Sequence, residues 1–180
     1  MDSPTTYDFG DGPVPAHRLE NGAWIADSAI VDCGASIGTG ARIAPGATID
    51  SGVFIGTGAR IDQGAIINTN ASIGQGASIG PVAIVGPGAI IGERSSIGAD
   101  ARIDADALIH NRARVGGGAS IGAYARIGRG AVIGHGAQIG PAVRIGEFET
   151  IADFAVIGDR QHLSIDDVGA SAPASKGLRL

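Results

Sequence analysis

The chain has 180 residues, enough for one domain, and contains 31 glycines but only 4% aromatic residues. Its formal net charge of −5 excludes a general electrostatic attraction to nucleic acid or to anionic lipid. A single cysteine, Cys33, cannot form an internal disulfide, and neither a membrane span nor a signal segment is visible, so a cytoplasmic protein is predicted.

Residues 1–22 lie outside the pattern that fills most of the chain. Their three prolines and three glycines indicate an extended arm. Trp24 follows at a position that we expect to point outward. Val14 or Leu19 is expected to cover this tryptophan, so that the arm caps the N-terminal end of the domain.

Residues 23–160 form an unbroken repeat of six residues, which amounts to 23 hexads without an insertion or deletion. Position three of every hexad is Ile or Val, and position one is Ala, Ser or Val except at Glu149. Because strand residues alternate between two faces, positions one and three should point inward and position two outward. Gly, Asn or Asp suits the corner that follows each strand. Each hexad is therefore predicted to form one short strand and one turn.

The repeat unit, as in residues 37–42 (IGTGAR), resembles the hexapeptide repeat of the trimeric acyltransferase superfamily over about three quarters of the chain. The resemblance implies an all-β fold, a single-stranded left-handed parallel β-helix of about seven to eight triangular coils. The left hand is implied by the resemblance alone, since parallel strand connections usually have the opposite hand. With strands about 4.8 Å apart, the coils would stack into a prism about 37 Å long.

Three hexads make one coil, so a period of three hexads assigns every outward side chain to one of three faces. Face one begins at Trp24, face two at Ile30 and face three at Ser36. Face one is mostly polar and is expected to be solvated. Apolar outward residues gather on faces two and three instead: Phe54, Ile66, Ile84, Ile90 and Leu108. Such a cluster on a polar prism indicates a subunit interface, and we predict a homotrimer packed through these two faces.

The hexad pattern is interpreted as ending at residue 160. Residues 161–180 are predicted to contain a last strand over 162–165 and a flexible tail rich in Ser, Ala and Pro. Phe148 and Phe154 occupy corner positions of the last coils. We expect this segment to fold back there, over the open end of the prism.

Two histidines are candidates for a catalytic base. Enzymes of the superfamily that the repeat resembles use histidine on an acceptor hydroxyl or amine, and imidazole suits this role because its pKa lies near neutrality. His135, within residues 133–140 (IGHGAQIG), resembles the segment around the catalytic histidine of the lipid A acyltransferases, which have Asp or Asn where Gly136 stands. His110 is the second candidate. The other two histidines lie in the arm and the tail and are poor candidates.

Arginines surround His110 in the repeat. Arg94 and Arg112 are one period apart at the corner after face three, Arg129 lies at this corner one coil on, and Arg114 lies on a flanking strand. Guanidinium groups fit phosphate well, so these four arginines are a candidate site for a coenzyme A phosphate or a carrier protein. A solvated ladder of charges is the alternative interpretation.

No metal or tightly bound cofactor is predicted. Asp32, Asp50 and Asn68 stack at one corner and could hold a cation, but a polar stripe is the preferred interpretation. The γ-class carbonic anhydrases share the fold that the resemblance implies, but their close pair of histidines is absent. Acetyl-CoA or acyl-CoA would be a co-substrate.

Two functions therefore remain open. The chain is either an acyltransferase, moving an acyl group from a CoA or carrier-protein thioester to a hydroxyl or amine, or a non-catalytic β-solenoid that serves as a scaffold or assembly module. The resemblance favours the enzyme. The unbroken ladder favours the scaffold, because acyltransferases of the superfamily usually interrupt a coil with a loop that covers the acceptor. Fold alone does not decide between them.

Overall fold

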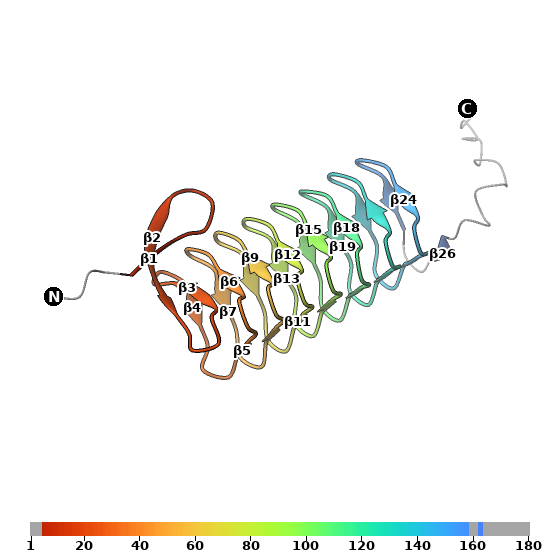
Figure 1. The fold of residues 1–180 in the computed structure, drawn as a ribbon. Helices are drawn as coiled ribbons and strands as arrows, with labels where there is room; N and C mark the ends of the chain where they lie inside the picture. Colours follow the sequence, from red (N-terminus) through yellow and green to blue (C-terminus); the bar gives the residue numbers. More distant parts are fainter. Residues whose placement is uncertain (1–4, 159–161, 164–180) are drawn as a thin grey trace, which may run out of the picture.

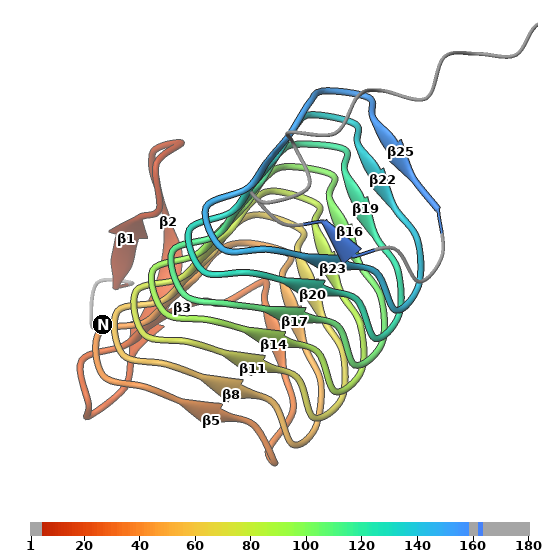
Figure 2. The ribbon, with the colours of Figure 1, turned by 90° about the vertical axis from the view of Figure 1, so that its right-hand side faces the viewer.

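The structure is a computed structural model that describes residues 5–158 and 162–163. Within these residues every regular element is a β-strand, and the strands form three long sheets. The coils follow one another along a rod (Figure 1), and each coil is triangular in cross-section (Figure 2). The chain is therefore a parallel β-helix with about seven coils, as predicted.

The three faces of the prism correspond to the three sheets, and each face takes one strand from every coil. Face one contains β3 (Trp24–Ala26), β6 (Arg42–Ile43), β9 (Arg60–Ile61), β12 (Ser78–Ile79), β15 (Ser96–Ile97), β18 (Arg114–Val115), β21 (Val132–Ile133) and β24 (Thr150–Ile151). Face two contains β4 (Ile30–Val31), β7 (Thr48–Ile49), β10 (Ile66–Ile67), β13 (Ile84–Val85), β16 (Arg102–Ile103), β19 (Ser120–Ile121), β22 (Gln138–Ile139) and β25 (Val156–Ile157). Face three contains β5 (Ser36–Ile37), β8 (Phe54–Ile55), β11 (Ser72–Ile73), β14 (Ile90–Ile91), β17 (Leu108–Ile109), β20 (Arg126–Ile127), β23 (Arg144–Ile145) and β26 (His162–Leu163).

Strands one coil apart pair in parallel with a constant register of three hexads. Ile67 lies opposite Val85, for example, and Ile73 lies opposite Ile91. The register continues into β26, where His162 pairs with Arg144. The interpretation that the period ends at residue 160 is therefore wrong for this strand. The predicted tail lies outside the described residues.

Positions one and three of the hexads build one continuous core along the axis. Nearly every Ala and Ile at these positions is buried from Ala41 to Ile145, and each buried isoleucine contributes about 1.5–3 kcal/mol. Glu149 is the exception at position one, and one oxygen of its carboxylate is buried without a hydrogen-bond partner among the described residues. The inward and outward assignments made from the period are correct.

Glycines at the corners serve two different purposes. At position six the backbone is left-handed, as at Gly40 with φ of 65°. At position four the successive coils touch: a Cβ on Gly74 would lie 2.6 Å from the backbone nitrogen of Glu93. At these glycines the contact between coils leaves no space for a Cβ, whereas other coils accommodate Asp62 or His110 at position four.

The N-terminal arm is a β-hairpin, not an extended segment. β1 (Thr6–Asp8) pairs antiparallel with β2 (Pro13–Arg18), and β2 pairs antiparallel with β3. The Tyr7 ring, which was not among the residues expected to cover Trp24, stacks on the tryptophan with centroids 4.6 Å apart. The guanidinium of Arg42 lies 5.7 Å from the centroid of the Tyr7 ring. The hairpin leaves Trp24 half-buried at this end of face one, while Arg42 and Arg60 are exposed as expected.

Candidate functional site

The corner after face three carries an arginine groove, which we define by its lining residues Glu93, Arg94, Asn111, Arg112 and Arg129. Its volume is about 280 Å³. The side-chain oxygen of Asn111 accepts a hydrogen bond of 3.0 Å from the backbone N–H of Glu93, which joins two coils. Among residues 5–158 none of the three arginines forms an ion pair. The groove therefore presents three cationic groups beside one carboxylate, which favours an anionic ligand.

The two other residues predicted for this site flank the groove without lining it. His110 is exposed at position four of the same corner, and its carbonyl accepts a hydrogen bond of 2.9 Å from the buried Ser95 hydroxyl. Arg114 is exposed on β18, on the face one side of the corner. As the period predicted, Arg94, Arg112 and Arg129 lie together at this corner. Arg114 does not line the groove.

His135 lies at a different corner, the one after face one. Its backbone N–H donates a hydrogen bond of 2.7 Å to Asp153 Oδ1, one coil on. Its imidazole meets the Phe154 ring at 90°, with centroids 5.4 Å apart. On its other side lies the corner formed by Gly116, Gly117 and Gly118, where a Cβ on Gly117 would come 3.4 Å from Nδ1. The imidazole is exposed but confined, as a proton acceptor for a substrate should be.

The single chain does not bring the two histidines together. They occupy different corners of the prism, and their separation along the chain is more than one coil. Arg129 lies one hexad before His135, a third of a coil, and so stands at nearly the same height along the axis at another corner. Any site that uses both His135 and the arginine groove needs a second subunit.

Three residues of the predicted apolar cluster are exposed on faces two and three, and Ile84 and Leu108 are half-buried. Phe54 and Ile90 are 50% and 48% exposed on face three, and Ile66 is 37% exposed on face two. Ile66 pairs with Ile84, and Ile90 pairs with Leu108 on the next strand. The two apolar surfaces flank the corner that faces two and three share. Exposed apolar side chains that gather in this way are typical of an interaction surface.

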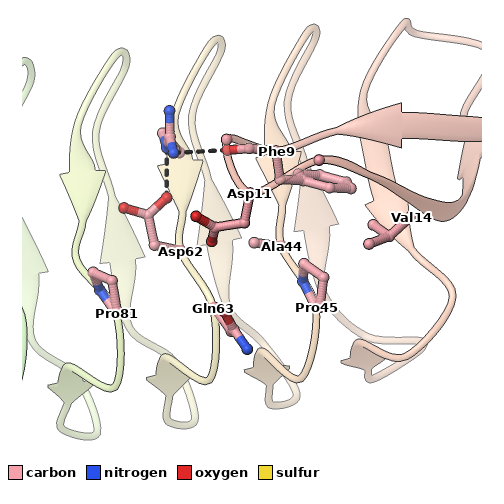
Figure 3. Close-up of a pocket in the computed structure, with 11 residues that line it drawn as sticks. Phe9, Asp11, Val14, Ala44, Pro45, Asp62, Gln63 and Pro81 are labelled. Carbon is pink, nitrogen blue, oxygen red and sulfur yellow. Dashed lines mark hydrogen bonds and ion pairs between the residues drawn. The ribbon is translucent and has the colours of Figure 1, made fainter.

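A further pocket, which no sequence pattern predicts, lies between the hairpin and face one (Figure 3). It has a volume of about 390 Å³ and is lined by the loop of residues 9–12 and by corner residues of three successive coils. Arg60 Nη2 donates a hydrogen bond of 2.8 Å to the carbonyl of Phe9, and Arg60 Nε donates to Asp62. The hydrogen bond and charge of Asp62 raise the pKa of Arg60, and Asp11 adds to this effect. The sequence repeat gives no sign of this pocket, because the residues that line it come together only in the folded chain.

Two classes of feature are missing from the part of the chain that the structure describes. Residues 5–158 contain no cluster of three or more His, Cys, Asp or Glu side chains that could hold a metal ion. The same part of the chain has no helix with the length and apolar character needed to cross a membrane.

Comparison with known proteins identifies the repeat. A family model described as bacterial transferase hexapeptide (six repeats) matches residues 70–105 and 100–135. A search of curated proteins finds no significant match.

Among solved structures, the chain is similar to a UDP-N-acetylglucosamine acyltransferase from Francisella novicida, with a TM-score of 0.77, 24% identity, and coverage of 81% of this chain and 60% of that chain. A mutant perosamine N-acetyltransferase from Caulobacter crescentus, in complex with CoA and GDP-perosamine, gives a TM-score of 0.50 and 20% identity over 76% of this chain and 52% of that chain. A further UDP-N-acetylglucosamine acyltransferase gives a TM-score of 0.50 and 21% identity over 77% and 67%. The chain thus spans about half to two thirds of these proteins.

These likenesses confirm the predicted fold. The chain carries the hexapeptide repeat and adopts the left-handed parallel β-helix of the acyltransferases that it resembles.

Proposed function

We propose that the chain is one subunit of a homotrimeric acyltransferase, which transfers an acyl group from a CoA-type thioester to a hydroxyl or amine. The observation that carries this proposal is the position of the two candidate sites relative to the apolar faces. His135 and the arginine groove lie at the two corners that bound faces two and three on their outer sides. The similar solved structures are acyltransferases, and one of them binds CoA, which supports the same reaction class.

A threefold assembly would bring the two corners together. If face two of one subunit packs on face three of the next, their shared corner points toward the symmetry axis. The corner of His135 then lies beside the arginine groove of the neighbouring subunit. Rotation about an axis parallel to the prism does not change height, so Arg129 of the neighbour would stand within about 2 Å of the height of His135, given about 4.8 Å per coil. His110 would stand about 7 Å lower on the same measure.

The chemistry follows from this arrangement. His135 takes the proton from the acceptor hydroxyl or amine as its oxygen or nitrogen attacks the thioester carbonyl. The tetrahedral intermediate then expels the thiolate, which receives the proton from the imidazolium. The arginine groove binds the phosphates of the donor by charge-assisted hydrogen bonds. His135 is preferred to His110 as the base because Phe154 and the triple-glycine corner confine its ring. A thioester donor and one free cysteine suit the reducing cytoplasm.

Mixed trimers test the proposal directly. One subunit carries His135→Ala, and a second, with a different tag, carries Arg112→Ala and Arg129→Ala. Each mutant alone should release little thiol from acetyl-CoA with amino sugars as acceptors. A mixed trimer contains one cleft that combines an intact histidine with intact arginines, so it should recover about one third of the wild-type rate. Mixed trimers as inactive as the two parents would contradict a site between subunits.

The scaffold remains the second candidate, and one observation favours it. No loop interrupts the coils between residues 24 and 157, so the described part of the chain carries no inserted cover for an acceptor. A scaffold should assemble normally yet release no thiol from acetyl-CoA with any acceptor, and CoA should not raise its melting temperature.

A further inference from the structure

The pocket under the N-terminal hairpin is a built cavity and not a gap between coils. Its wall on one side is the hairpin loop, in which the Asp8 carboxylate accepts hydrogen bonds from the backbone N–H groups of Gly10 and Gly12. The loop is also tied to the coil by the hydrogen bond from Arg60 to the Phe9 carbonyl. The cavity has a volume of about 390 Å³, which lies within the usual range for small-molecule sites, about 300–1,000 Å³.

The walls of this cavity are mostly apolar. Phe9 and Val14 come from the hairpin, and Pro45 and Pro81 come from the corner after face one. Proline rings and a phenyl ring are rigid apolar groups, so they favour a compact ring or a short hydrocarbon body. Figure 3 shows these groups arranged around the space that Asp11 enters from the loop.

The charge inside the cavity is unbalanced. Asp62 is paired with Arg60, whose guanidinium also donates to the Phe9 carbonyl. Within residues 5–158 the Asp11 carboxylate forms neither an ion pair nor a hydrogen bond. Two carboxylates therefore face one guanidinium, which leaves one unbalanced negative charge on the exposed Asp11 beside the apolar walls.

We propose that this cavity binds a small organic cation, a primary ammonium group on a compact ring or hydrocarbon body, with Asp11 as the partner of the ammonium. The apolar walls hold the body of the ligand, and Asp62 adds to the attraction while it keeps Arg60 in place. Gln63 of this pocket lies four coils before His135 at the same corner, so the two sites are about 19 Å apart along the axis. The proposal is thus independent of the acyl transfer reaction.

Three probes of one shape and different charge test the cavity: cyclohexylamine, cyclohexanol and cyclohexanecarboxylate. Each is titrated into the full chain while backbone amide shifts are followed by NMR. Cyclohexylamine should shift the amides of residues 9–12 and 60–63, and cyclohexanol should bind about tenfold more weakly because it lacks the charge-assisted hydrogen bond. Cyclohexanecarboxylate should not bind. Equal affinity for the amine and the alcohol, or no binding of the amine, would overturn the proposal.

Two variants and a control separate charge from shape. Asp11→Asn should weaken cyclohexylamine about tenfold and leave cyclohexanol unchanged. Asp106→Asn makes the same change at an exposed corner of another coil and should alter neither affinity. Val14→Phe keeps every charge but fills the cavity, and it should abolish binding of both probes. If Asp11→Asn disturbs the Tyr7–Trp24 contact, Val14→Phe decides the question, since continued binding to that variant contradicts the site.

Discussion

The ring of Phe154 lies at right angles to the imidazole of His135, and the two centroids are 5.4 Å apart. Phe154 occupies this place because its backbone is left-handed, with φ of 58°. A Cβ on Gly136 would come 2.7 Å from the phenyl ring, so only glycine admits the ring there. Gly136 stands where the lipid A acyltransferases have Asp or Asn. This glycine therefore lets Phe154 reach the histidine.

His135→Ala should reduce kcat for thiol release by about 10²–10⁴-fold, the usual contribution of a positioned general base. KM for acetyl-CoA should change little, because the proposed donor site is the arginine groove and not His135. His110→Ala, at the other corner, is the matched control and should retain most of the activity. Equal losses in both variants would contradict the choice of His135 as the base.

Arg129→Ala should raise KM for acetyl-CoA about tenfold, since it removes one of the charge-assisted contacts proposed for the donor phosphates. The effect should shrink at high salt because screening already weakens the wild-type contact. Arg18→Ala removes one charge at the N-terminal hairpin and serves as the control. If Arg18→Ala raises KM as much as Arg129→Ala does, net charge and not the groove is responsible.

Ile90→Glu should convert the proposed trimer into monomers, since it places a charge at the centre of an apolar contact surface. Light scattering coupled to gel filtration measures the change in mass. Ser96→Glu adds the same charge to an exposed position on face one and should leave the mass unchanged. A wild-type chain that is already monomeric would remove both the trimer and its intersubunit site.

Gly74→Ala should lower the stability of the chain by about 2–3 kcal/mol, as overpacking of a tight contact does. The added Cβ would lie 2.6–2.9 Å from backbone atoms of the next coil, so two coils must separate. Gly40→Ala places a Cβ in open space at φ of 65° and should cost only about 1 kcal/mol, from left-handed backbone strain. The shift in the midpoint of urea unfolding gives both values, and equal shifts would show that the coils tolerate the extra methyl group.

Val82→Asn should raise stability by about 1 kcal/mol because a β-branched residue is unfavourable in left-handed backbone and asparagine is tolerated there. Val82 has φ of 58° and is 57% exposed, so it loses little packing when replaced. Val132→Asn makes the same change at an exposed strand position and should not stabilise. Thermal unfolding compares the two variants, and a lower melting temperature for Val82→Asn would disprove the strain.

The regular part of the fold could be read from the sequence because one period governs it. Each residue of a coil contacts its equivalent in the next coil. The pairing of Ile67 with Val85 can therefore be predicted from the period alone. The hairpin has no such pattern. Its placement depends on Tyr7 meeting Trp24 and on Arg60 meeting Phe9, which are contacts between residues of unrelated position in the repeat.

The candidate site was predictable to the same extent. The period placed Arg94, Arg112 and Arg129 at one corner, and the structure has them together in the groove. It did not predict the confinement of His135, because the left-handed Phe154 stands where Gly, Asn or Asp was expected. The proposed cleft between subunits depends on a second chain, whose approach is specified by surface shape and not by the repeat.

The backbone hydrogen bonds between coils have a consequence for how the chain folds and how it can be lengthened. The N–H of Ser72 donates to the carbonyl of Ala89, and the N–H of Ile90 donates to the carbonyl of Ala107, so each bond closes a loop of the same size. The entropy lost on closing a loop depends on its length, and here this cost is the same for every coil. Folding can thus begin in any pair of coils and spread in both directions. A segment of three hexads, one full coil, could be removed or duplicated within the repeat, and the coils on either side would meet the same partners as before.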